Sequence, residues 1–149
     1  MIGEKKLPSV TSILEATKSE EDKAALANWV ERTGLKESEA IVKAASNRGS
    51  KMHAYLESFL LGQQNLSFFD DNEQYKIMAK QIIEKGLINR FEEVWGVECT
   101  LYKPDSYSGT CDAVGIYDGR ESIIDFKQSN KPKKFEYIDS WLLQAAAYS

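Results

Sequence analysis

The chain of 149 residues has little cysteine and proline and only one histidine. The two cysteines, Cys99 and Cys111, come without a Cys-x-x-Cys pair or a second histidine, which excludes a tetrahedral zinc site built from this chain. We expect both thiols to be buried and reduced. No apolar run approaches the length that crosses a bilayer. The first seven residues lack the charged and then apolar pattern of a signal peptide. We therefore expect a cytoplasmic protein with no membrane partner.

Positive charge is also scarce, since the net charge is −4 and the pI is near 5.1. This balance disfavours a protein that coats nucleic acid, because such binding needs many cationic contacts to phosphates. A metal-binding pocket contributes carboxylates of its own, so the local field around a site matters more than the total charge. The one positive cluster is either a solvated loop or a track for phosphates; it comprises Lys127, Lys131, Lys133 and Lys134.

Length and composition predict one domain over residues 1–149, because the chain suffices for one core and is short for two. Residues 1–90 are expected to be mainly helical. Apolar residues recur there at helical spacing, most clearly from Met52 to Leu60, and cap signals precede these stretches. The predicted helical features are a capping box at Ser12–Glu15 after Pro8, a helix from the Ser19 cap to Gly34, a helix over 37–45, a break at 47–49, a helix from the Ser50 cap to Gly62, and a helix over 72–88 after a loop with Asp70 and Asp71.

The period changes to two from Phe91, which predicts strands over residues 91–127. The first strand places Glu98 on its less apolar face. Asp118-Gly119 predicts a tight hairpin turn, because both residues tolerate a positive φ. The predicted second and third strands are 109–117 and 121–127, and a helix follows over 137–148. The fold class is therefore α/β in the mixed α+β sense, with a three-stranded meander flanked by helices.

Two strand carboxylates are the most informative chemical feature. Asp112 and Asp125 lie inside otherwise apolar strands, where an unpaired charge is costly. Asp125 and Lys127 are two residues apart and should share one face of their strand. With Asp112 alongside, two oxygen ligands and an amine would suit a divalent cation and a phosphodiester. The alternative is a solvated strand face on which Asp125 simply pairs with Lys127.

Polar pairs on two predicted helices provide further candidates. His53 and Glu57 lie one turn apart, so the carboxylate would orient the imidazole or share a cation with it. Gln144 and Tyr148 have the same spacing and would hold a phosphate or fix the lysine. A single histidine is more often an ordinary surface or core residue. The aromatic residues near this helix are either core residues or stacking platforms for bases; they are Phe135, Tyr137 and Trp141.

These motifs occur in a characteristic order: His53, Glu98, Gly109-x-x-Asp112, Asp125-Phe126-Lys127 and Gln144-x-x-x-Tyr148. In this order they resemble the PD-(D/E)xK nuclease superfamily, specifically its RecB-like exonuclease branch. Residues 7–14 and 48–57, and the helix with Trp29, are similar to the mitochondrial genome maintenance exonucleases and their phage and bacterial relatives. The resemblance covers nearly the whole chain.

The resemblance implies a restriction-endonuclease-like core and a DNA exonuclease that uses Mg²⁺ or Mn²⁺ on single-stranded DNA or DNA ends in replication, recombination or repair. It implies metal binding by His53, Asp112, Asp125 and the Phe126 carbonyl, with Glu98 as an outer ligand. Lys127 would orient the nucleophile. The other residues implied at the site are Gln144 and Tyr148 near the chemistry and Arg48, Lys51, Lys131, Lys133 and Lys134 on the DNA strand.

The family continues beyond its tyrosine with more helix and further strands, whereas this chain ends at Ser149. We therefore expect a fragment, a split nuclease or an incomplete core, with a partner chain or a further C-terminal segment completing the sheet. The rival interpretation is a non-catalytic DNA- or protein-binding module built on that core. A third is a small structural protein whose stability is indifferent to divalent ions.

Overall fold

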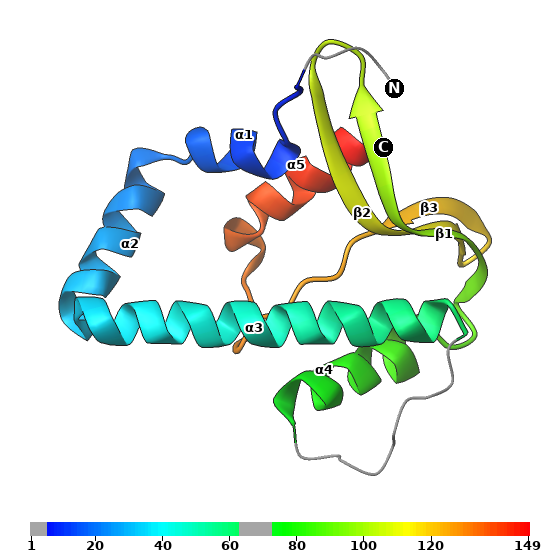
Figure 1. Cartoon of the computed structure of the whole chain (residues 1–149), viewed down its shortest axis with the longest axis horizontal. Helices are drawn as coiled ribbons and strands as arrows, with labels where there is room; N and C mark the ends of the chain where they lie inside the picture. The colour runs from blue at the N-terminus through cyan, green and yellow to red at the C-terminus, as the bar shows by residue number, and fades with distance from the viewer. Residues whose placement is uncertain (1–5, 63–72) are drawn as a thin grey trace.

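Helices and one small sheet make up the part of the chain that the structure describes, residues 6–62 and 73–149 of a computed structural model (Figure 1). The predicted α+β class is confirmed. Figure 1 shows the long helix α3 running between α4 and the rest of the fold. The elements are α1 (Val10–Ala16), α2 (Glu20–Thr33), α3 (Leu35–Leu60), α4 (Gln74–Ile82), the π-helix η1 (Ile83–Leu87), β1 (Phe91–Lys103), β2 (Tyr107–Tyr117), β3 (Arg120–Ile124), the 3₁₀-helix η2 (Phe135–Tyr137) and α5 (Asp139–Tyr148).

Serine side chains begin the first two helices. The Ser9 hydroxyl accepts a hydrogen bond from the Ser12 amide at 3.1 Å, so the cap of α1 lies three residues before the predicted cap at Ser12. The prediction for α2 is confirmed, because Ser19 accepts from the amide of Asp22 at 3.1 Å and Gly34 ends the helix with a positive φ of 88°. Each hydroxyl satisfies a backbone amide that the helix itself leaves unpaired.

Helix α3 is continuous over 26 residues, so the predicted break at 47–49 and the second cap at Ser50 are wrong. The error arises at Gly49, which is buried in the middle of the helix. A glycine there costs about 1 kcal/mol relative to alanine, which locally favours a break. The side chain of Gln128 packs against Gly49 from outside the helix, and this tertiary contact compensates for the poor local propensity.

The helix predicted over 72–88 consists of two parts. Helix α4 runs over Gln74–Ile82 and then widens into η1, whose wider turns end at Leu87. Ala79, Ile83 and Leu87 are buried along this combined element. The predicted starting residue Asn72 and the preceding loop with Asp70 and Asp71 lie outside the described residues.

The sheet is an antiparallel meander in the order β1-β2-β3 within the described residues. Its hairpin turn has the predicted chemistry, because Asp118 and Gly119 both have positive φ, 48° and 74°. The Arg90 guanidinium beside Asp118 lowers the pKa of that carboxyl. Cys99 pairs directly with Cys111 across β1 and β2, and both thiols are free. Cys111 is fully buried as expected, whereas Cys99 is only partly buried.

Strand β3 ends at Ile124, whereas we predicted that it continues to Lys127. Its last ladder pair is Ala113 with Ile124. Beyond this pair the Phe126 amide donates to the Asp112 side chain, not to a backbone carbonyl. A carboxylate thus takes the place of the next ladder partner, and the chain leaves the sheet there.

Two apolar clusters hold these elements together. The larger joins α3 to α4 and η1 and includes Phe126, which follows β3. The smaller lies between α1, β2 and α5 and contains Val10, Cys111 and Tyr148. The apolar face predicted from Met52 onward is confirmed, since Met52 and Leu56 are fully buried. None of the helices within 6–62 and 73–149 combines the length and apolarity needed to cross a membrane.

Candidate active site

The imidazole of His53 meets two groups from the other half of the chain. Its Nε2 lies 3.3 Å from Oδ2 of Asp112 and 3.0 Å from the carbonyl oxygen of Phe126. Helix α3 supplies the histidine, β2 supplies the aspartate, and the segment after β3 supplies the carbonyl. The Phe126 amide in turn donates to Asp112. Three motifs that are far apart in sequence therefore form one cluster.

The second ring nitrogen of His53 contacts its own helix. Nδ1 lies 2.8 Å from the carbonyl oxygen of Gly49, one turn earlier. This contact, not Glu57, orients the ring, which corrects the first of the two predicted roles of Glu57. The pKa of His53 is raised to about 9, chiefly by the hydrogen bond to Asp112. The Gly49 and Phe126 carbonyls also raise this pKa, whereas burial of the ring lowers it. The ring is therefore protonated at neutral pH without a bound cation.

The raised pKa of His53 predicts a pH dependence of stability. Because the folded-state pKa of about 9 exceeds the usual 6.5, the contribution is fully present below pH 6.5 and is lost as the pH rises toward 9. Since both side chains are partly exposed, we expect a loss of only about 1 kcal/mol between pH 6 and 8.5. Urea unfolding in EDTA will measure it. His53→Gln should remove this difference, and an unchanged pH dependence in that variant would contradict the linkage.

Asp125 and Lys127 form an ion pair just beyond β3. Their pairing across Phe126 agrees with the predicted shared side, although residues 125–127 lie outside any strand. The Lys127 side chain is 31% exposed and the Asp125 side chain 17%. The lysine therefore reaches solvent while its carboxylate partner stays largely covered.

Tyr148 and Gln144 pack closely beside Gly109. Gln144 Nε2 donates to the Tyr148 hydroxyl at 3.0 Å, and both residues are buried. A Cβ on Gly109 would lie 2.8 Å from that hydroxyl and 3.0 Å from Cζ. Glycine is therefore required for α5 to approach β2 this closely. The Gly-x-x-Asp and Gln-x-x-x-Tyr motifs thus contact each other.

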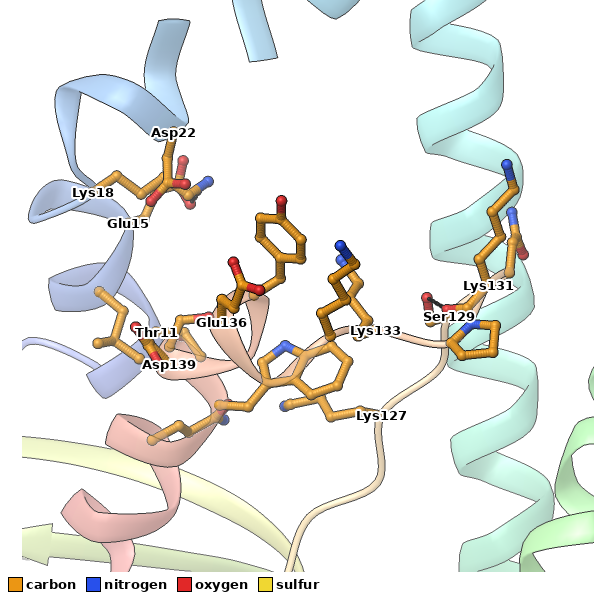
Figure 2. Close-up of a pocket in the computed structure, with 18 residues that line it drawn as sticks. Thr11, Glu15, Lys18, Asp22, Lys127, Ser129, Lys131, Lys133, Glu136 and Asp139 are labelled. Carbon is orange, nitrogen blue, oxygen red and sulfur yellow. Dashed lines mark hydrogen bonds and ion pairs between the residues drawn. The ribbon is translucent and has the colours of Figure 1, made fainter. Parts of the chain in front are cut away.

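A cleft of about 1060 Å³ opens beside Lys127. Figure 2 shows Lys127, Lys131 and Lys133 on one side and the carboxylates of Glu15, Asp22, Glu136 and Asp139 toward the other. Trp141 lies in the cleft wall, with the Lys133 ammonium 5.8 Å from its ring centroid. The lining includes Lys127, Lys134 and Gln144 but neither His53 nor Asp112. Lys127 therefore lines the cleft, whereas His53 and Asp112 do not.

Three of the residues expected at the site lie apart from this cluster. Arg48 donates hydrogen bonds to the side chains of Gln128, Asn130 and Gln74. Lys51 lies 3.9 Å from Glu73 and over the ring of Tyr75. Glu98 is exposed and has a positive φ of 52°, and its neighbours Val97 and Cys99 pair with Ala113 and Cys111 of β2.

The donor set at His53 suits a hard divalent cation. His53 Nε2 lies within 3.3 Å of a carboxylate oxygen of Asp112 and of the carbonyl oxygen of Phe126. Donor atoms at such separations can bind one small ion. Across residues 6–62 and 73–149, no three histidine, cysteine or carboxylate side chains gather closely enough to hold a metal ion. The fit therefore rests on two side chains and one backbone oxygen.

The comparison with known proteins agrees with the expected likeness to genome maintenance exonucleases. No family model matches the chain. Mitochondrial genome maintenance exonuclease 1 of Homo sapiens is 29% identical over 137 residues, and the Mus musculus protein of that name is 31% identical over 132. These matches cover 87% and 85% of this chain, but the chain spans only 38% of either relative. The chain is thus distantly similar to genome maintenance exonucleases over most of its length.

Proposed function

We propose that this chain forms the core of a metal-dependent DNA exonuclease of the PD-(D/E)xK type, in its RecB-like branch. The observation that carries the proposal is the meeting of His53, Asp112 and the Phe126 carbonyl, with the ion-paired Asp125 and Lys127 on either side of Phe126 in the sequence. A phosphodiesterase needs such a group of oxygen and nitrogen ligands next to a cationic side chain. The similarity to genome maintenance exonucleases supports DNA as the substrate.

The metal in this proposal is Mg²⁺ or Mn²⁺. His53, Asp112 and the Phe126 carbonyl would hold it, with Asp125 as a further ligand after release from Lys127. When bound, such an ion lowers the pKa of a water and polarises the scissile phosphate. Lys127, freed from Asp125, positions the nucleophile and offsets charge that develops on the phosphate oxygens.

The cleft beside Lys127 would receive the DNA strand. Lys131, Lys133 and Lys134 give it a positive side for the phosphates, and Trp141 offers a ring on which a base can stack. Gln144 and Tyr148 contribute mainly by holding α5 against Gly109. Arg48 acts differently from its expected role on DNA, because its guanidinium already has three partners within the protein.

Metal removal provides the test of this function. Labelled single- and double-stranded oligonucleotides with either end blocked should be degraded with Mg²⁺ or Mn²⁺, at a rate at least about 100-fold above that in EDTA. Asp125→Ala should abolish the metal-dependent degradation, since it removes a ligand and the partner of Lys127. Equal degradation in EDTA, or an active Asp125→Ala protein, would refute the proposal.

A non-catalytic DNA- or protein-binding module is the second candidate. The Asp125–Lys127 ion pair favours it, because the carboxylate and the ammonium bind each other and not a metal ion or a phosphate. Calorimetric titration with Mn²⁺ separates the two functions. A nuclease should bind Mn²⁺, and His53→Gln should weaken that binding. A module without the site should give the same heat of Mn²⁺ titration with and without the substitution.

A further inference from the structure

Gln128, the residue after the Asp-x-Lys motif, is bound on both sides of its amide. Nε2 donates to the Ala45 carbonyl at 2.6 Å, and Oε1 accepts from Arg48 Nε at 2.9 Å. Both partners belong to α3, some eighty residues earlier in the chain. The sequence analysis did not single out Gln128; its only signal is its place next to Lys127.

Gly49 makes room for this amide. A Cβ at Gly49 would lie 2.9 Å from Gln128 Nε2 and 3.5 Å from its Cδ. Any side chain at this position would therefore force the amide end of the Gln128 side chain to shift. The same residue provides the carbonyl that holds His53 Nδ1. One helical turn of α3 thus positions both the histidine and the chain that follows Lys127.

Arg48 extends the contact to two further segments. Its terminal nitrogens donate to Asn130 at 2.7 Å and to Gln74 at 3.2 Å. A planar guanidinium with three partners is held in one orientation. Arg48 therefore ties residues 128–130 to α3 and to the start of α4. We refer to Gln128 with Ala45, Arg48 and Gly49 as the Gln128 clamp.

The clamp lies where the sheet no longer fixes the chain. β3 ends at Ile124, so the placement of Lys127 depends on the residues on either side of it. Phe126 is anchored in the apolar core and at His53 on one side. Gln128 is anchored on α3 on the other. Between these anchors, the backbone of Lys127 is held in place while its side chain pairs with Asp125.

We propose that Gln128 is a positioning residue that, through Arg48 and Gly49, sets the place of Lys127 relative to the His53–Asp112 cluster. This inference rests on the proposed nuclease function and adds the element that aligns its lysine. A small displacement of a group that acts on the reacting phosphate lowers the rate of chemistry more than substrate affinity. The clamp therefore acts on kcat.

Kinetics on a single-stranded oligonucleotide with Mg²⁺ will test the clamp. Gln128→Ala should lower kcat by about 10- to 100-fold and change KM by less than about threefold. Asn28→Ala, which removes an exposed side-chain amide on α2, is the matched control and should leave both constants unchanged. Unchanged kcat in Gln128→Ala, or a rise in KM alone, would overturn the proposal.

Gly49→Ala tests the clamp from the opposite side. Alanine favours the helix over glycine, so this variant should keep or raise the melting temperature while displacing Gln128. We expect it to lower kcat as Gln128→Ala does, which a general loss of stability does not explain. A stable Gly49→Ala protein with full kcat would overturn the proposal, even if Gln128→Ala fails to fold.

Amide hydrogen exchange separates this inference from the proposed function. Exchange over residues 126–130 should be faster in Gln128→Ala than in the native protein, while exchange in α5 stays the same. If the native protein cleaves no DNA, the nuclease proposal fails but this measurement still decides whether the clamp exists. Unchanged exchange over 126–130 would overturn it.

Discussion

Asp112→Asn is expected to lower the rate of DNA cleavage by about three orders of magnitude. Asp112 is the carboxylate that His53 contacts at 3.3 Å, and it also accepts the Phe126 amide. Asparagine keeps the size and an oxygen that can accept that amide, but it removes the negative charge. The variant should therefore fold and yet lose its affinity for the cation.

The measurement combines cleavage of a labelled oligonucleotide with calorimetric titration of Mn²⁺. Glu121→Gln is the matched control, because it neutralises an exposed carboxylate on β3 of the same sheet. This control should cleave DNA at the native rate. Cleavage by Asp112→Asn within tenfold of the native rate, with the fold intact by circular dichroism, would remove Asp112 from the proposed site.

Gly115→Ala is expected to give the largest loss of stability, about 3 kcal/mol. Gly115 is buried in β2 and pairs with Val94 on one side and Ser122 on the other. A Cβ there would overlap the carbonyl of Glu93 and lie 2.6 Å from Cε2 of Phe91. Backbone cannot move aside as a flexible side chain can, so the first two strands must separate.

Thermal unfolding will show this loss as a fall in Tm of roughly 6 to 12 °C for a domain of this size. Gly86→Ala is the matched control. Gly86 lies in η1, where an added Cβ meets nothing within 4 Å, so the variant should unfold at the native temperature or above it. A native Tm for Gly115→Ala would contradict this prediction, because it would show that the backbone of β1 can shift to admit the added methyl group.

Local chemistry predicted the parts of the fold that depend on neighbouring residues. The Ser19 cap, the Gly34 stop and the Asp118-Gly119 turn each involve a few adjacent residues, and the structure shows all three. The apolar spacing from Met52 onward also gave the buried face of α3. Such caps and turns can be predicted from sequence because the residues that determine the local conformation are adjacent in the chain.

Two errors have a different origin. The predicted break in α3 ignored Gln128, which packs on Gly49 from 79 positions away. The predicted length of β3 ignored Asp112, whose carboxylate binds the Phe126 amide. In both cases a side chain from a distant segment decided the backbone conformation. Residue patterns within a short window contain no record of such a partner.

The candidate site shows the same division. Motif order pointed to His53, Asp112 and Phe126, and the structure brings these residues together. The resemblance implied Arg48 on the DNA strand, yet its guanidinium donates to Gln74, Gln128 and Asn130. A motif does not reveal whether a guanidinium already has partners within the protein. Gln128 lacked any motif and was missed.

The contacts of His53 and Gln128 join positions that are 73 and 83 residues apart, so the order in which the chain folds matters. Closing such long loops is slow compared with forming a helix or a hairpin. A chain caught with only its local elements formed would have α3 and the meander but no assembled centre. The proposed nuclease activity would then arise late in folding, after the chain has reached its final topology, and an incompletely folded copy would not cleave nucleic acid.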